Sequence, residues 1–308
     1  MTSTYKTQSA VLLLIHKRPL QTSIVMQAIR EVQPCRLYVS ADGPRDHVEG
    51  EKALCEEALS ESRKVDWDCL RQEHVSTENL GCGKAVKEGV DWFFSQEPEG
   101  IILEDDCVPM RDFFRLCDFT LERFRDDERI MMISGTNVTG AWKTPDNASY
   151  FYSSLGGIWG WATWRRSWNL HDGGYADFSH ATKNHLIRKD LSWVDGMTRQ
   201  GAIRRSRDRM LDTWAFPWAL TRHVHGGLSI VPRVNLIDNI GFDQEATHTF
   251  RSPHIQPAQK LIDDPFTVNG LVRPDRKYDK RVVRLSGQFR WLRSFIYELV
   301  HGNFLRKY

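Results

Sequence analysis

The sequence has no long apolar segment and no excess of charge of either sign. Its longest apolar run, Ala10 to Ile15, is far shorter than the roughly 18 residues of a membrane-spanning helix and shorter than a signal-peptide core. We therefore expect a cytoplasmic protein, with at most peripheral contact at the inner face of a membrane. The 42 Lys and Arg residues are balanced by 40 Asp and Glu residues, a net charge of +2. This balance argues against electrostatic capture of nucleic acid, so no nucleic-acid partner is expected.

Cysteine is also scarce, and its spacing excludes two common uses. The six Cys residues all lie within the first 117 positions, and none forms a C-x-x-C pair or a Cys/His cluster with zinc-site spacing. We interpret them as reduced thiols that are mostly structural. Apolar side chains, in contrast, are plentiful: 41% of the residues are hydrophobic and 11% are aromatic, enough for a sizeable globular core.

Up to about residue 135, short apolar runs alternate with longer segments of helical period. This pattern is typical of an α/β domain in which helices flank a mostly parallel central sheet. The expected strands are 9–15, 36–40, 65–72, 100–103 and 129–134, and the expected helices are 19–32, 48–62, 82–94 and 109–124.

Polar residues directly follow several of these strands. The first strand is followed by His16-Lys17-Arg18, the second by Ala41-Asp42-Gly43 and the fourth by Glu104-Asp105-Asp106. Because the carboxyl ends of parallel strands meet at one edge of a sheet, and ligands bind there, we expect these side chains to share one site.

The three adjacent carboxylates indicate a metal site. Such anions repel one another, and their oxygen ligands suit Mg²⁺ or Mn²⁺. Since Mg²⁺ usually completes its shell with phosphate oxygens and water, a phosphorylated substrate is expected. The alternative is a solvated acidic turn that caps the helix beginning at Pro109.

Tryptophan is concentrated in the second half of the chain. Eight of the 11 Trp residues fall between Trp142 and Trp218, around the Gly-rich stretch 156–161, which we interpret as a second lobe. The predicted organisation is a main domain over 1–251, with halves at 1–135 and 136–251, and then a Pro-containing extension and a basic amphipathic helix over 252–308. That helix could lie on an anionic membrane, or pack on the main domain or a second subunit.

At the acidic segment the sequence resembles the glycosyltransferases of GT-A fold, which carry Asp-X-Asp or Glu-Asp-Asp on the turn after a core strand. The run Ile102 to Pro109, followed by Asp112-Phe113-Phe114, is most similar to the N-acetylglucosaminyltransferase I family, whose Val-Val-Glu-Asp-Asp precedes a similar Asp-Phe-Phe. Three further segments resemble that family in the same order, namely 39–43, Gly160-Trp161 and 211–214. The resemblance covers roughly residues 9 to 241 in order and spacing, with identity confined to the motifs.

The resemblance implies a GT-A fold, a nucleotide-diphosphate sugar donor such as a UDP-sugar, and Mn²⁺ or Mg²⁺. It makes 1–251 the catalytic domain, with 1–135 as the nucleotide-binding half and 136–251 as the acceptor half, which contains the Trp-rich acceptor lobe. It also implies that Asp42 meets the uracil, that Asp106 ligates the metal, that Asp105 contacts the ribose or a metal-bound water, and that Asp212 is the catalytic base. The alternative for Asp42 is a simple turn. For Asp212 it is the cap of a helix that runs to His223.

Other candidates would complete this site. Gly81-Cys82-Gly83 leads into a helix start, where a phosphate is stabilised. Together with the metal, Lys17, Arg18 or Lys84 could stabilise the departing diphosphate. The remaining expected donor-site, sugar-contacting and metal residues are His16, Glu104, Gly160, Trp161 and His248.

These observations predict a metal-dependent, inverting glycosyltransferase of polysaccharide biosynthesis, which transfers a hexose or N-acetylhexosamine to a glycan or lipid-linked glycan. One alternative is a sugar-phosphate nucleotidylyltransferase, which would need a Gly-rich loop after the first strand. His16-Lys17-Arg18-Pro19 contains no Gly. The other is a carbohydrate-binding or scaffold protein on an inactive transferase fold, against which the intact, mutually repelling carboxylates argue.

Overall fold

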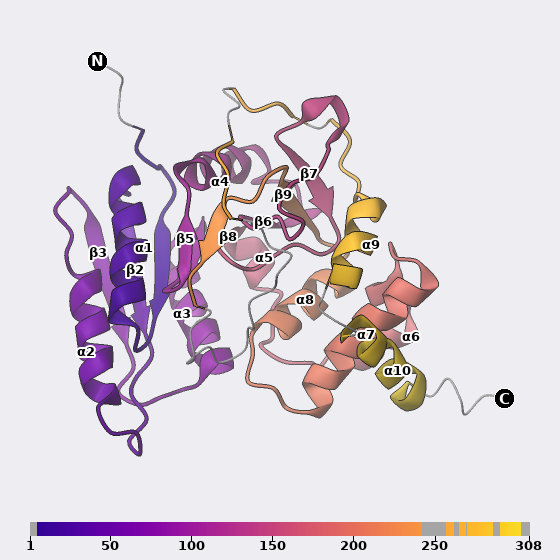
Figure 1. Ribbon diagram of the computed structural model, residues 1–308, viewed down its shortest axis with the longest axis horizontal. Coiled ribbons are helices and arrows are strands. Elements are labelled where there is room, and N and C mark those ends of the chain that lie inside the picture. Colours follow the sequence, from indigo (N-terminus) through magenta and orange to yellow (C-terminus); the bar gives the residue numbers. More distant parts are fainter. Residues whose placement is uncertain (1–4, 242–256, 262–264, 269, 286–289, 303–308) are drawn as a thin grey trace.

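The computed structural model describes residues 5–241, 257–261, 265–268, 270–285 and 290–302. Within them, eight strands form one sheet in the order β3-β2-β1-β4-β8-β6-β9-β7 (Figure 1). The strands are β1 (Val11–Ile15), β2 (Arg36–Ala41), β3 (Leu70–Val75), β4 (Glu99–Glu104), β6 (Ile130–Ser134), β7 (Tyr150–Ser153), β8 (Trp161–Trp164) and β9 (Leu228–Pro232). A separate two-stranded ribbon pairs β5 (Cys107–Pro109) with β10 (Ile237–Asn239).

The sheet confirms the predicted α/β class. Strands β3, β2, β1 and β4 are mutually parallel, and β9 runs parallel to β6. Strand β8 lies antiparallel between β4 and β6, and β7 lies antiparallel to β9. The sheet therefore continues across residue 135, where the sequence analysis divided the catalytic domain.

Helices cover both faces of the sheet, because the buried side chains of β1 and β4 are apolar on both faces. All five residues of β1 are buried. On one face, Leu13 belongs to the same buried cluster as Val25 and Phe113, and on the other Leu12 joins Val86. The helices are α1 (Pro19–Val32), α2 (Glu51–Ser62), α3 (Cys82–Gln96), α4 (Arg111–Arg123), α5 (Arg165–Trp168), α6 (Phe178–Lys183), α7 (Trp193–Asp208), α8 (Ala215–Val224), α9 (Arg276–Leu285) and α10 (Arg290–His301).

The prediction of the third strand over 65–72 was wrong, because β3 begins only at Leu70 and ends at Val75. Residues Val65 and Trp67 are apolar because they pack against the core from a loop, where Trp67 Nε1 donates to Pro34 O at 2.9 Å. Strand β3 is itself polar and largely accessible, as an edge strand can be.

Four residues of the tryptophan-rich segment, Trp161, Trp168, Trp214 and Trp218, pack together in the core, whereas Trp193 is 54% exposed. Trp161 and Trp218 are no more than 1% exposed. Their rings lie 6.0 Å apart, and Trp161 also stacks on Trp214 at 5.2 Å. This cluster fills the space between the sheet, α3 and α8, which explains why Trp is concentrated there.

Helix α10 packs on α7, at the side of the molecule away from α2 and β3 (Figure 1). The buried Glu298 carboxylate accepts hydrogen bonds from Gln200 Nε2 and Arg204 Nε, at 2.5 and 2.7 Å. Packing on the catalytic domain was one of the predicted alternatives for this helix, and membrane contact stays a prediction. None of the helices in the described ranges is both long and apolar enough to cross a membrane.

Candidate active site

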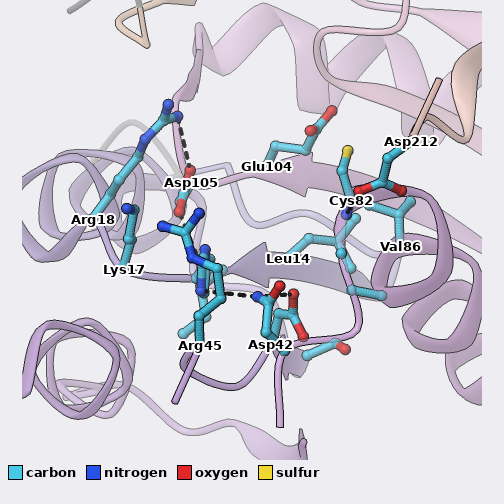
Figure 2. Close-up of a pocket in the computed structure, with 16 residues that line it drawn as sticks. Leu14, Lys17, Arg18, Asp42, Arg45, Cys82, Val86, Glu104, Asp105 and Asp212 are labelled. Carbon is cyan, nitrogen blue, oxygen red and sulfur yellow. Dashed lines mark hydrogen bonds and ion pairs between the residues drawn. The ribbon is translucent and has the colours of Figure 1, made fainter. Parts of the chain in front are cut away.

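A cavity of about 470 Å³ opens at the carboxyl ends of β1, β2 and β4 and at the N-terminus of α3 (Figure 2). Arg18 and Asp105 lie on one side of it, and Cys82 and Asp212 on the other. The cavity therefore joins residues that are far apart in the sequence, as the positions of the strand ends predict. Its polar lining residues are His16, Lys17, Arg18, Ser40, Asp42, Arg45, Asn79, Cys82, Glu104, Asp105 and Asp212.

The acidic turn follows β4 directly and lies against the loop after β1. Arg18 Nη1 lies 2.8 Å from Asp106 Oδ2 and 3.6 Å from Asp105 Oδ1. The backbone N–H of His16 donates to Asp105 Oδ2 at 3.2 Å, and Asn239 Nδ2 donates to Asp106 Oδ1 at 3.4 Å. The turn is thus held between the β1 loop and β10, with Glu104 and Asp105 lining the cavity and Asp106 beside it.

Burial and repulsion between neighbouring charges disfavour ionisation of Glu104 and Asp105. Burial, followed by the charges of Asp106 and Asp105, raises the pKa of Glu104 to about 8. Burial and the charge of Asp106 raise the pKa of Asp105 to about 7, against the opposing effect of Arg18. The turn is therefore stabilised by any added positive charge.

The acidic turn fits a hard divalent cation that takes most of its ligands from a bound phosphorylated molecule. Its ligands are all oxygen, as Mg²⁺ and Mn²⁺ prefer. Among the described residues, however, no three His, Cys, Asp or Glu side chains converge as a ready-made metal centre. The turn can supply one or two ligands, and a phosphorylated ligand would have to supply others. The predicted ligand His248 lies outside the described residues.

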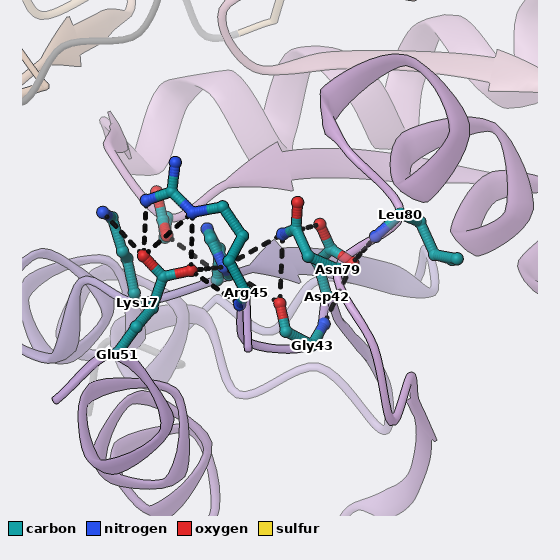
Figure 3. Close-up of polar contacts among 9 residues, drawn as sticks. Lys17, Asp42, Gly43, Arg45, Glu51, Asn79 and Leu80 are labelled. Carbon is teal, nitrogen blue, oxygen red and sulfur yellow. Dashed lines mark hydrogen bonds and ion pairs between the residues drawn. The ribbon is translucent and has the colours of Figure 1, made fainter. Parts of the chain in front are cut away.

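Asp42 stands at the end of β2 in a network of hydrogen bonds (Figure 3). Its Oδ1 accepts from the backbone N–H groups of Gly43 and Leu80, at 2.9 and 2.8 Å, and its Oδ2 accepts from Asn79 Nδ2 at 2.9 Å. Burial raises the pKa of Asp42, and the backbone hydrogen bonds oppose this shift. Asp42 therefore both fixes the turn and presents a carboxylate oxygen to the cavity, so its two predicted roles are compatible.

Glu51, which the sequence analysis missed, anchors the cationic side of the cavity (Figure 3). This carboxylate is 1% exposed and accepts from Lys17 Nζ at 3.0 Å and from Arg45 Nε at 2.9 Å. The Arg45 hydrogen bonds, ahead of those from Lys17, hold the pKa of Glu51 far below its usual range. Glu51 thereby fixes two cations that line the cavity. Nothing in the local sequence distinguishes it from the neighbouring acids of α2.

Asp212 lies at the cavity and binds the N-terminus of α3. Its Oδ2 accepts from the backbone N–H of Cys82 at 2.8 Å, and its Oδ1 from that of Gly83 at 2.6 Å. The residue is exposed. The expected cap of the following helix is wrong, because the N-cap of α8 is Trp214. Asp212 instead caps a helix from elsewhere in the chain.

Four of the predicted site residues that the structure describes do not line the cavity. Asp106, the predicted metal ligand, lies beside it, where it pairs with Arg18 and accepts from Asn239. Lys84 is exposed, and its Nζ lies 3.6 Å from Oε1 of Glu88 on the same helix. Trp161 is buried in the core, so it cannot stack on a sugar ring in this structure. Gly160 serves packing, since it has φ +57° and a Cβ there would lie 2.5 Å from the Ile237 side chain. The residues that the sequence analysis did not single out are Arg45, Glu51 and Asn79.

Comparisons with known proteins give no family for this chain. No protein-family model matches it, and no curated protein has a matching sequence. Similar solved structures include HddC from Yersinia pseudotuberculosis, at 12% identity over 52% of this chain and 78% of that one, with a TM-score of 0.33. Another is apo mouse xyloside xylosyltransferase 1, at 11% identity over 70% of this chain and 81% of that one, with a TM-score of 0.35.

A third is UDP-glucose pyrophosphorylase complexed with UDP-glucose, at 8% identity over 52% of this chain and 78% of that one, with a TM-score of 0.29. Similarity this weak carries no argument about fold or function. The comparisons also do not place the chain in the N-acetylglucosaminyltransferase I family.

Proposed function

We propose that this protein is a glycosyltransferase of GT-A type that moves a sugar from a nucleotide-diphosphate donor, specifically a UDP-sugar, to a hydroxyl group of a glycan. The observation that carries the proposal is the cavity that unites the Asp42 and Asn79 cluster, the cations Lys17 and Arg18, and Glu104 and Asp105 of the acidic turn. These groups match the three parts of such a donor: an imide N–H donor in the base, two anionic phosphates, and a metal-bound leaving group.

The residues then have distinct roles. Asp42 accepts the imide N–H of uracil, and Arg18 and Lys17 bind the diphosphate. Asp106 and Asp105 would hold a divalent cation, which neutralises charge on the departing diphosphate. The cationic residues and the acidic turn thus place the leaving group on one side of the cavity, opposite Asp212.

Asp212 is proposed as the general base. It takes the proton of the acceptor hydroxyl while the acceptor oxygen bonds to the anomeric carbon, and the bond from that carbon to the diphosphate oxygen breaks with its electron pair leaving on the nucleoside diphosphate. Attack from the side opposite the leaving group inverts the anomeric configuration. The two N–H groups of α3 orient the carboxylate for this step. We propose transfer of a hexose or N-acetylhexosamine to a glycan or lipid-linked glycan.

Calorimetric titration of UDP and of GDP, with and without Mn²⁺, tests the donor site. We expect UDP to bind at least about tenfold more tightly with Mn²⁺, to bind more tightly than GDP, and to lose the metal effect in Asp106→Asn. Asp66→Asn is the matched control, because Asp66 pairs with Arg30 on the surface, away from the cavity. A screen of UDP-sugars for transfer follows. If neither nucleotide binds the folded wild-type protein with metal, the proposal is wrong.

A further inference from the structure

Arg18 connects two parts of the site that the proposed function uses separately. Its backbone is fixed, because its carbonyl accepts from Thr22 N at 2.9 Å and from Thr22 Oγ1 at 2.8 Å. Its side chain reaches from this point across to the acidic turn, where one guanidinium nitrogen lies within ion-pair distance of both Asp105 and Asp106. The Arg18 side chain is only 15% exposed. Arg18 is therefore anchored at its backbone, and its charge lies at the acidic turn.

This charge stands where a divalent cation would need the same oxygens. In the described part of the chain, Asp105 and Asp106 both form their ion pairs with Arg18. A cation bound to Asp106 Oδ2 would lie within a few ångströms of the guanidinium. Two positive charges at that separation in a partly buried site repel strongly. The observed Arg18 contacts and a cation on these carboxylates therefore compete with one another.

The donor offers Arg18 another partner. A diphosphate presents several anionic oxygens, and a guanidinium binds such oxygens with two parallel hydrogen bonds. Arg18 lines the same cavity in which the proposed donor lies. If the Arg18 side chain moves from the acidic turn to the diphosphate, Asp105 and Asp106 lose their counter-ion. At the same time the phosphate oxygens become available as further ligands for the metal.

We propose that Arg18 is an exchangeable counter-ion that makes metal binding depend on donor binding. It neutralises Asp105 and Asp106 in the empty site and transfers to the diphosphate when the donor arrives. The inference rests on the proposed function. Because coupling between two ligands is reciprocal, the donor strengthens metal binding by the same factor by which the metal strengthens donor binding.

Binding of Mn²⁺, measured from the electron paramagnetic resonance signal of free Mn²⁺, tests this inference without any turnover. We expect Arg18→Gln to bind Mn²⁺ alone at least about tenfold more tightly than wild type, a typical size for such coupling. In wild type, UDP should strengthen Mn²⁺ binding about tenfold or more. In Arg18→Gln the gain should be at least about threefold smaller, because only the direct contribution of the phosphate ligands remains. Arg18→Lys retains the charge and should stay close to wild type for Mn²⁺ alone.

Lys17→Gln is the matched control, since it removes one positive charge from the same loop but from a residue paired with Glu51 instead. Its affinity for Mn²⁺ alone should change less than about threefold. A thermal unfolding transition should first show that Arg18→Gln is folded. If the folded variant then binds Mn²⁺ alone no more tightly than wild type, or no more tightly than Lys17→Gln, the inference is overturned. If the wild-type protein binds no UDP with any metal, the proposed function itself has failed, and the two failures are thus distinguishable.

Discussion

The carboxylates around the cavity show how one side-chain type performs different work according to what surrounds it. Glu51 is buried but accepts from two cations, so its pKa falls. Glu104 is buried next to two other acids, so its pKa rises to about 8. Asp212 is exposed and accepts two backbone N–H groups at a helix N-terminus. Placement by the fold, rather than residue type, therefore decides which carboxylate anchors, which holds a proton and which can face an acceptor.

Replacement of Asp212 separates its two roles. Asp212→Asn keeps one oxygen for the α3 cap but cannot accept a proton, so we expect kcat to fall at least about 100-fold while UDP affinity changes little. The cap change should cost about 1 kcal/mol or less of the free energy of unfolding. Turnover of the donor found in the screen gives kcat. Calorimetry gives the UDP affinity, and urea unfolding gives the free energy of unfolding.

The control is Asp172→Asn, since Asp172 is also exposed and accepts one backbone N–H, from Gly174. It should retain wild-type turnover. Retention of more than a tenth of kcat by Asp212→Asn would show that Asp212 is a helix cap only.

The sequence predicts site residues well where they directly follow a strand. His16, Arg18, Asp42, Glu104 and Asp105 all line the cavity, because parallel strands bring their carboxyl ends to one edge whatever the loops do. Residues inside loops or helices are harder to predict. Asn79 reaches the site through a loop, and Glu51 through the first turn of α2, so their place depends on tertiary structure alone.

At the scale of elements, apolar period was the reliable signal and composition was not. Helix α1 was predicted with its observed bounds, because Pro19 suits a first turn and the buried residues of the helix recur at helical spacing. The polar edge strand β3 was misplaced because its six residues contain no apolar run. The clustering of Trp was mistaken for a ligand surface, since composition does not tell an interior cluster from an exposed one.

The contact between α7 and α10 depends on a glycine. A Cβ at Gly201 would lie 1.9 Å from the Ser294 carbonyl oxygen, which is backbone and cannot move independently. We therefore expect Gly201→Ala to separate the two helices and to lower the free energy of unfolding by about 1 to 3 kcal/mol. Hydrogen exchange at α10 and urea unfolding measure the effect.

Gly174→Ala is the control for this prediction, because nothing lies closer than 4.0 Å to a Cβ there. It should stay within about 0.5 kcal/mol of wild type. Unchanged protection of α10 in Gly201→Ala would contradict the close packing of the two helices.

At the scale of the whole molecule, one sheet carries both the site and the core. Strand β8 pairs with β4 on one side and β6 on the other. The strand that ends in the acidic turn is therefore fixed by the part of the chain that holds the tryptophans. The fold class could be predicted because the first half alternates strands and helices. The antiparallel insertion of β8 could not, since its pairing is long-range and leaves no local signal.

The buried tryptophan cluster (the aromatic layer) also makes the free energy of unfolding depend on pH, through His171. This residue is 6% exposed and lies between Trp168 and Trp218. The hydroxyl of Thr221 donates to Pro217 O, so His171 Nδ1 donates to Thr221 Oγ1. Nε2 is buried and has no hydrogen-bond partner among the residues that the structure describes. Protonation at Nε2 would bury a charged donor with no acceptor. Burial, and then the charge of Lys87, lowers the pKa of His171 from 6.5 to about 4.

Because the folded protein holds this imidazole neutral, the unfolded chain binds the extra proton first as pH falls. The free energy of unfolding should therefore decrease below pH 6.5, by about 3 kcal/mol in total once pH 4 is reached. His171→Phe keeps a neutral ring in the layer and should remove this part of the slope, whereas His180→Gln, at an exposed position, should leave it unchanged. Urea unfolding at intervals between pH 7.5 and 4 measures the slope directly. An identical slope in wild type and His171→Phe would mean that other groups govern acid sensitivity.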